Sequence, residues 1–251
     1  MLKFVKDQPA IFIEEESILV IGDLHLGLTY RLYMQGINLP DQVSSMRKRI
    51  EKLLRKTGAK NLVILGDLKD EVPGINYTET FEIPKFLSSL SRMAKIIICK
   101  GNHDTHLEKI IPEDITIHQA RGFSIKKYFF QHGHEWPSSE FLKCDYLISS
   151  HIHPVLEFRD EFGYKVSRPV WVKATVEKKK FQKRYKIKED GTIEINIIPS
   201  FNPLLGGYPI NRIREIERIS PIFRKDIIDP EKTELYLLDG TYIGTVKDIK
   251  N

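Results

Sequence analysis

Cysteine is scarce in this chain of 251 residues, which contains only Cys99 and Cys144 and no Cys-x-x-Cys pair. Two thiols in a protein of this size favour buried free cysteines over a disulfide framework, and they exclude a zinc site built from cysteine pairs. No hydrophobic run reaches the length of a transmembrane helix, and the first residues place charges at Lys6, Asp7 and Glu14 beside a short apolar patch, unlike a signal-peptide core. We therefore expect a cytoplasmic protein that does not enter a membrane.

A large excess of one charge sign is also missing, because 39 lysines and arginines face 34 acidic residues, a net charge of +5. The hydrophobic fraction of 41% and the charged fraction of 29% are those of a globular protein and exclude intrinsic disorder. The basicity is local, since Lys178 to Lys188 hold seven cations and no acid, which leaves a net charge of −2 on the rest of the chain. This stretch could follow a nucleic-acid backbone while Phe181 and Tyr185 stack on bases, or it could be a solvated hairpin whose aromatic rings face the sheet.

Short apolar runs rich in β-branched residues predict buried strands, and each run ends at a polar turn. These runs are residues 17–21, 61–65, 95–99 and 146–148. Between the first three of them, apolar residues recur at helical spacing over Asp41 to Thr57 and Thr78 to Arg92. The order strand, helix, strand, helix, strand predicts a parallel sheet with right-handed crossovers.

The pattern changes after Ile115 to strands joined by short turns, which predicts antiparallel or mixed β-structure. We expect strands at 123–131, 169–175, 181–188 and 192–198, and a hairpin that joins 234–238 to 241–246 around Asp239-Gly240. Several prolines and Gly206-Gly207 mark the last segment. We therefore expect one domain over residues 1–204 and a C-terminal appendage, residues 205–251, that packs on its core.

Metal-ligand residue types gather where the predicted strands end. They form five blocks: Gly22-Asp23-Leu24-His25, Gly66-Asp67, Gly101-Asn102-His103-Asp104, His132-Gly133-His134 and His151-Ile152-His153. Any one of these histidines alone would more simply be a core residue, but loops at the carboxyl ends of parallel strands converge on one crevice. Carboxylates, imidazoles and an amide without thiolate suit Mn²⁺, Fe²⁺ or Zn²⁺. The candidate ligands are too many for one tetrahedral ion, whereas two ions about 3.5 to 4 Å apart that share a carboxylate are used for phosphoester hydrolysis.

The order of these blocks resembles the signature of the calcineurin-like metallophosphoesterase superfamily. The resemblance implies an α/β fold, a four-layer α/β/β/α sandwich of two mixed sheets flanked by helices. It also implies that Asp67 bridges two divalent metal ions, with Mn favoured and Fe, Zn, Ni or Mg as alternatives. The remaining ligands would be Asp23, His25 and His153 for the first ion and Asn102, His132 and His151 for the second. Ser150 stands where the superfamily usually has glycine, and we expect the turn to survive because serine is small.

Within the superfamily, the sequences DLHLG, GDLKDE, HGHEWP and SFNPLLGG are similar to archaeal SbcD-related and bacterial DNA-ligase-associated phosphoesterases. This similarity favours hydrolysis of phosphodiester bonds by a nuclease that acts on DNA or RNA. The alternative is a phosphatase or phosphodiesterase for small nucleotides or phosphoproteins, since only about fifty residues follow Leu204. A non-catalytic scaffold is a third interpretation, which the complete set of ligand types opposes.

Four further residues receive roles outside the ligand set. His103 would stabilise the transition state or protonate the leaving oxygen, and Asp104 would either orient His103 or cap its own turn. Arg31 would bind a substrate phosphate or form an ion pair on a helix surface. His134 would contact the substrate phosphate or pack under Trp136.

Two neighbouring acids and two histidines complete the candidates. Asp70 and Glu71 follow the predicted bridging carboxylate and would either support the metal ligands or lie in solvent. His106 and His118 match none of the five blocks, and we expect them to be surface or core residues.

Overall fold

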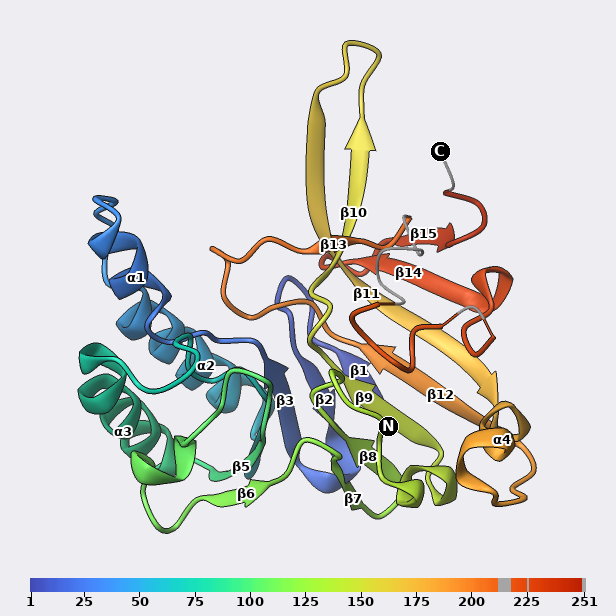
Figure 1. Ribbon diagram of the computed structural model, residues 1–251, viewed down its shortest axis with the longest axis horizontal. Helices are drawn as coiled ribbons and strands as arrows, with labels where there is room; N and C mark the ends of the chain where they lie inside the picture. The colour runs from blue at the N-terminus through green and yellow to red at the C-terminus, as the bar shows by residue number, and fades with distance from the viewer. Residues whose placement is uncertain (212–217, 225, 250–251) are drawn as a thin grey trace.

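Two β-sheets form the centre of the molecule, and two long helices cover the outer face of the first sheet (Figure 1). The computed structural model describes residues 1–211, 218–224 and 226–249. The first sheet has six strands, β1 to β6 in order, at Leu2–Phe4, Ile11–Ile13, Ile18–Gly22, Asn61–Leu65, Lys95–Cys99 and Thr116–His118. β3, β4 and β5 run parallel, as predicted. The parallel strand β6 was not predicted, and β1 and β2 extend the other edge in antiparallel pairing.

The helices of the first sheet lie where the sequence predicts crossovers. α1 (Leu28–Met34) and α2 (Gln42–Thr57) connect β3 to β4, and α3 (Tyr77–Ser91) connects β4 to β5. The Asp41 side chain caps α2, and Asn76 and Glu79 form a reciprocal capping box at the start of α3. Both predicted helices are therefore confirmed to within one residue at each end, whereas the short α1 was not predicted.

The second sheet is mixed and has nine strands among the described residues. Seven of them lie in the order β13 (Tyr208–Pro209), β10 (Pro154–Arg159), β11 (Lys165–Glu177), β12 (Thr192–Ile197), β9 (Tyr146–Ser149), β8 (Tyr128–Phe130) and β7 (Phe123–Ile125). In addition, β14 (Thr233–Leu237) pairs with both β11 and β15 (Tyr242–Thr245). The far ends of β10 and β11 form a hairpin that projects beyond the rest of the sheet (Figure 1).

Alternation along the strands sorts the apolar side chains into three layers. In β3, Leu19 and Ile21 pack with the helices, whereas Ile18 and Val20 pack toward the second sheet. The outer face of the second sheet is covered, among the described residues, by η3 (Ser139–Lys143), η4 (Lys178–Phe181), α4 (Gln182–Tyr185) and apolar residues that follow residue 218. The α/β sandwich of two mixed sheets flanked by helices is thus confirmed, and its fourth layer consists of short helical turns and coil.

Two of the predicted strands differ from the structure. Residues 181–188 form no strand, because Phe181 is fully buried against Phe141 and the chain turns through η4 and α4 around it. Residues 123–131 are not one strand but the β7–β8 hairpin, whose turn contains Lys126 at a φ of 52°. The strand at 192–198 and the C-terminal hairpin are confirmed as β12 and β14–β15.

The C-terminal segment contributes strands to the second sheet, since β13 pairs with β10 and β14 with β11. The boundary between residues 204 and 205 stays a prediction. Residues 212–217, 225 and 250–251 of the predicted appendage lie outside the described residues. None of the helices in the described part of the chain is both long and apolar enough to cross a membrane.

Strand ends from both sheets converge on one region. The five sequence blocks follow β3, β4, β5, β8 and β9, so each lies just beyond the carboxyl end of its strand. The first three strands are parallel neighbours, and β8 and β9 are parallel neighbours in the facing sheet. The fold therefore places the blocks together across the edge where the two sheets meet.

Candidate metal centre

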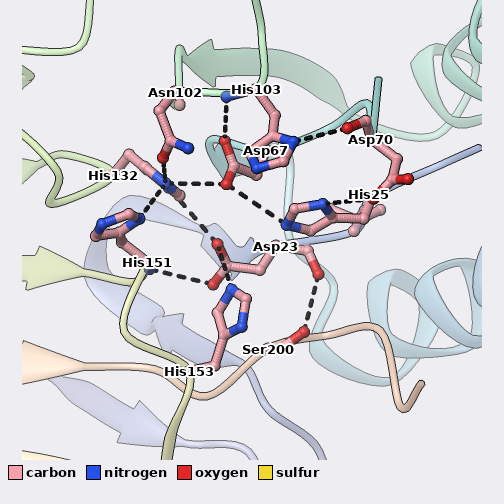
Figure 2. Close-up of polar contacts among 12 residues, drawn as sticks. Asp23, His25, Asp67, Asp70, Asn102, His103, His132, His151, His153 and Ser200 are labelled. Atoms are coloured by element: carbon pink, nitrogen blue, oxygen red, sulfur yellow. Dashed lines mark hydrogen bonds and ion pairs between the residues drawn. The ribbon is translucent and has the colours of Figure 1, made fainter. Parts of the chain in front are cut away.

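Side chains from all five blocks form one cluster (Figure 2). Potential ligand atoms lie within 4.8 Å of one another in three groups: Asp23 with His25 and His153, His25 with Asp67 and His103, and Asp67 with His132 and His151. Asn102 joins the third group, because its Oδ1 lies 3.2 Å from His132 Nε2. The structure thus brings together all seven residues that the sequence offers as ligands.

The backbone of this cluster adopts unusual conformations. Five of the seven residues have left-handed φ values, namely Asp23 at 56°, His25 at 44°, Asp67 at 48°, His151 at 71° and His153 at 41°. Non-glycine residues populate this region sparsely, at a cost of about 1–3 kcal/mol each, and such residues concentrate at functional sites. The loops therefore hold these side chains in positions that local propensity disfavours.

The first group is buried and lacks hydrogen bonds at the atoms that face its centre. Asp23 is fully buried and His25 is 5% exposed. Asp23 Oδ1, His25 Nε2 and His153 Nε2 form no hydrogen bond, and Asp23 Oδ1 and His153 Nε2 contact each other as an ion pair at 3.3 Å. Buried polar atoms without partners cost free energy, and one carboxylate oxygen with two imidazole nitrogens is a donor set that a divalent cation satisfies. The residues present therefore fit a metal ion.

One carboxylate oxygen lies between the first group and the third. Asp67 Oδ2 is 3.4 Å from His25 Nε2 and 3.3 Å from His132 Nε2. The other oxygen, Oδ1, accepts a hydrogen bond of 2.9 Å from the backbone N–H of His103, which fixes the plane of the carboxylate. His132 Nε2 also lies 3.0 Å from His151 Nδ1. Asp67 Oδ2 therefore lies between potential ligand atoms of two separate groups.

Contacts on the far side of three rings determine which nitrogen faces the centre. The Nδ1 atoms of His132 and His153 lie 2.8 and 3.2 Å from backbone carbonyl oxygens. Nδ1 of His25 lies 3.1 Å from Asp70 Oδ1. Because carbonyl and carboxylate oxygens only accept, each Nδ1 carries a proton, and Nε2 is the nitrogen that faces the centre and can bind a metal ion. Metal-binding histidines use this arrangement.

Arg31 and Asp70 form an ion pair behind the first group. Arg31 Nε donates to Asp70 Oδ2 at 2.6 Å, and its Nη2 donates to Oδ1 at 3.2 Å. The Asp70 side chain is 1% exposed, so it supports His25 and does not lie in solvent. The Arg31 side chain remains 49% exposed in this pair. The ion pair is the alternative that the sequence left open for Arg31, and its contact with substrate phosphate stays a prediction.

His103 and Asp104 do not contact each other as the sequence suggested. His103 Nδ1 donates to the backbone carbonyl of Asp70 at 2.7 Å, which leaves Nε2 on the side of the cluster. The Asp104 carboxylate accepts hydrogen bonds from three backbone N–H groups, those of Leu68, Lys69 and Gly101. Asp104 therefore caps the turn and fixes the loop of Asp67. The Asp70 carbonyl, which sequence reasoning missed, holds His103 in its place.

The segment SFNPLLGG reaches the cluster from a distant part of the sequence (Figure 2). Ser200 Oγ donates to the Asp23 carbonyl at 3.0 Å, and Asn202 Nδ2 donates to the Leu24 carbonyl at 2.8 Å. The carbonyl of Gly206 accepts from His153 Nδ1. The segment thus clamps two ligand loops, a role that its residue types alone did not indicate.

The serine in the last block does not disturb its turn. Ser150 Oγ donates to the Leu65 carbonyl at 2.7 Å, and Ser150 N donates to the His132 carbonyl at 2.9 Å. The hydroxyl therefore joins the β4 and β9 loops. The expectation that the turn survives a serine is confirmed.

Comparison with known proteins supplies the family. A family model for calcineurin-like phosphoesterases matches residues 16–189, more than half of the chain. The chain belongs to this family. Among solved structures it is similar to the nuclease MPE of Pseudomonas putida, with 18% sequence identity, a TM-score of 0.59 and coverage of 94% of this chain and 92% of that one. It is also similar to YfcE, a phosphoesterase from Escherichia coli, with 17% identity, a TM-score of 0.44 and coverage of 93% and 99%. No curated protein sequence matches the chain.

Membership in the calcineurin-like phosphoesterase family identifies the protein as a metal-dependent phosphoric ester hydrolase. The likeness to the P. putida structure supports the fold. The finer similarity to archaeal SbcD-related phosphoesterases stays a prediction, as do the metal identity and the division of ligands between two ions.

Charges within the phosphoesterase cluster hold protons on two of its rings. Burial alone would lower the pKa of His25, but the carboxylates of Asp67 and Asp70 outweigh it and raise the pKa to about 10. Burial of His132 is likewise outweighed by Asp67 and Asp23, which raise its pKa to about 9. A cation that binds Nε2 of His25 or Nε2 of His132 must displace the proton on that nitrogen.

Metal binding is therefore expected to release protons and to tighten as the pH rises. The pKa values of His25, about 10, and His132, about 9, are both above pH 7. Both rings are therefore protonated when no metal is bound. Roughly one or two protons leave per chain, and the apparent affinity rises about tenfold per pH unit for each proton. Calorimetry of Mn²⁺ binding in buffers of different ionisation enthalpy measures this number. A Mn²⁺ affinity that is constant between pH 7 and 9 would contradict the release of protons on metal binding.

Substitution of Asp70 tests the support behind His25. Asp70→Asn removes the charge that pairs with Arg31 and faces His25 Nδ1, and we expect Mn²⁺ affinity to fall about 10- to 100-fold, the usual effect of losing such a partner. Competition with a fluorescent chelator gives the affinity. Glu71→Gln is the matched control, because it removes a neighbouring charge outside the cluster. Equal losses in both variants would show that general electrostatics, and not orientation of His25, is responsible.

Proposed function

We propose that this phosphoesterase holds two divalent cations on its seven clustered side chains and hydrolyses phosphodiester bonds of nucleic acids. The observation that carries the proposal is the position of Asp67 Oδ2 between His25 Nε2 and His132 Nε2, 3.4 and 3.3 Å away. Asp23, His25 and His153 would hold one cation and Asn102, His132 and His151 the other. Bound cations supply Lewis acidity at the phosphoryl oxygens and a nucleophile from water at neutral pH.

The chain's own residues complete the chemistry. The His103 ring lies beside His25, with ring centroids 4.7 Å apart, and its Nδ1 is tied to a carbonyl. Its Nε2 is thus free to carry a proton to the leaving oxygen of the substrate. His134 contributes from the other side, where its ring centroid lies 5.2 Å from that of His132. Burial lowers the pKa of His134 to about 4, so the ring is neutral when it contacts a phosphate oxygen.

A nucleic-acid substrate is supported by the local basicity of residues 178–188 and by the similarity to a P. putida protein described as a nuclease. The aromatic residues of this stretch do not serve the purpose suggested from sequence. Phe181 is 1% exposed, and the Tyr185 hydroxyl donates to the Pro137 carbonyl at 2.7 Å. The stretch is therefore suited to contact phosphates through its cations. Burial removes Phe181 from any base, and the Tyr185 ring packs 5.5 Å from that of Phe141.

Three substrates with Mn²⁺ test the proposal: a chromogenic phosphate monoester, a chromogenic phosphodiester and single-stranded DNA. We expect turnover of the diester and cleavage of DNA, with a steep loss of DNA binding as salt rises. Turnover of mononucleotides or of the monoester with no cleavage of DNA or RNA would favour the alternative phosphatase. Turnover of no ester by the Mn²⁺-loaded protein would favour a scaffold and would overturn the proposal.

A further inference from the structure

An open cavity of about 630 Å³ lies next to the metal centre and contains an unusual concentration of arginine. Arg121, Arg184, Arg218 and Arg224 line it, together with Trp136 and His134. His134 lines the cavity and also lies beside the candidate metal ligands, because its ring centroid is 5.2 Å from that of His132 and 5.8 Å from that of His151. The cavity therefore borders the cluster of candidate metal ligands through His134.

The arginines come from separate segments that the fold holds in place. The guanidinium of Arg184 lies over the Trp136 ring, 4.2 Å from its centroid. The segment of Arg218 is tied to the metal-ligand loop, because Ser220 Oγ donates to the Gly133 carbonyl at 2.9 Å. The carbonyl of Arg121 accepts a hydrogen bond from the backbone of residue 138. Their convergence is thus a property of the fold.

Among the residues that the structure describes, acidic side chains balance only part of this charge. Arg224 Nε pairs with Asp226 at 3.1 Å, and Glu135 also lines the cavity, where it lies 3.8 Å from His134. Within residues 1–211, 218–224 and 226–249, no ion pair engages Arg121, Arg184 or Arg218. Guanidinium groups match phosphate oxygens in bidentate geometry, so this cavity is suited to a phosphate group.

A second cavity of about 370 Å³ extends the basic surface away from the metal centre. It shares Trp136, Arg184 and Arg224 with the first cavity and adds Lys180 and Lys183 of the basic stretch. The acid that also lines it, Asp226, is the one that pairs with Arg224. A path of cations thus leads from His134 through the arginines to residues 178–188. These cations extend over two cavities, farther than one phosphate group needs. Such an extended basic surface is typical of proteins that follow a nucleic-acid backbone.

We propose that the arginine cavity binds a phosphate of a nucleic-acid strand whose scissile phosphate lies on the metal centre. The proposal rests on the proposed function and extends it, since it assigns the strand's path on the protein surface. The recognised group is a phosphate, either an internal one or the phosphate at a strand end. The consequence is selectivity for an oligonucleotide over a diester too small to reach the cavity.

Binding of a fluorescein-labelled single-stranded oligonucleotide of about 12 nucleotides tests this without catalysis. Anisotropy is measured in EDTA, so that no cleavage occurs. The variant Arg121→Gln/Arg218→Gln is expected to bind at least about tenfold more weakly, and the slope of log affinity against log salt is expected to fall by about 1.4, or 0.7 per lost contact. The control Lys52→Ala/Lys56→Ala removes two exposed charges from α2 and should bind as the wild type does.

Two further measurements separate the outcomes. Strands with 5′-phosphate, 3′-phosphate and hydroxyl ends distinguish the source, because a loss common to all of them indicates an internal phosphate and a loss confined to one phosphorylated end indicates a terminal one. A loss as large in the Lys52/Lys56 variant, or an unchanged affinity and salt slope in the arginine variant, overturns the proposal. Wild-type protein that binds the strand through the arginines but cleaves no diester leaves this site in place and refutes the proposed function alone.

Discussion

Replacing Asp67 with asparagine is expected to lower phosphodiester turnover by at least about 10²- to 10³-fold, the loss typical when one electrostatic stabiliser is removed from an active site. Asp67→Asn keeps the size of the side chain but removes the negative charge of the oxygen that lies between His25 and His132. One cation site or both should then lose affinity. Turnover of a chromogenic diester and metal content by mass spectrometry are measured on the same preparation.

Asp41→Asn provides the matched control for this substitution. Asp41 is exposed and caps α2, where asparagine serves about as well as aspartate, so neither stability nor turnover should change. If Asp67→Asn hydrolysed the diester at the wild-type rate, the shared-carboxylate assignment would be refuted.

Substitution of His103 is expected to separate catalysis from metal binding. His103→Ala should lose about 10²- to 10⁴-fold in turnover of a substrate with a poor leaving group, because protonation of the leaving oxygen is lost. A diester with a nitrophenolate leaving group needs little protonation and should lose much less. Rates for the two esters and the metal content are compared with those of His106→Ala, which replaces an exposed histidine three residues away.

The leaving-group dependence also decides between two roles for His103. Its nearness to His25 and Asp67 places it in a group that could hold a metal ion. If metal content and the turnover of both esters fell together in His103→Ala, His103 would be reassigned as a metal ligand. A normal metal content with a selective loss on the poor leaving group supports the proton donor.

The blocks of the candidate site were visible in the sequence because each lies where a strongly apolar strand ends. Parallel strands such as β3, β4 and β5 are buried on both faces, so they read as continuous apolar runs and their ends are easily located. The convergence of their loops then follows from topology. Both crossover helices were predictable from the sequence because apolar residues recur along them at helical spacing.

Other features depend on contacts between distant segments and could not be predicted. The KKKF sequence has no local property that prevents a strand, and burial of Phe181 against Phe141 decides its helical turn. Asp104 is adjacent to His103, yet its carboxylate binds the loop of Asp67 across 36 residues. The arginine cavity likewise combines segments of the chain that are far apart in sequence, so no single stretch of sequence predicts it.

The shared use of Asp67 by two cations is tested most directly by titrating the metal-free protein with Mn²⁺ and following the titration by electron paramagnetic resonance. Two ions held by one carboxylate are close enough to couple magnetically. The account predicts saturation at two Mn²⁺ per chain, with an exchange-coupled spectrum that disappears in Asp67→Asn. Saturation at one ion, or two ions whose spectra remain independent, would contradict it.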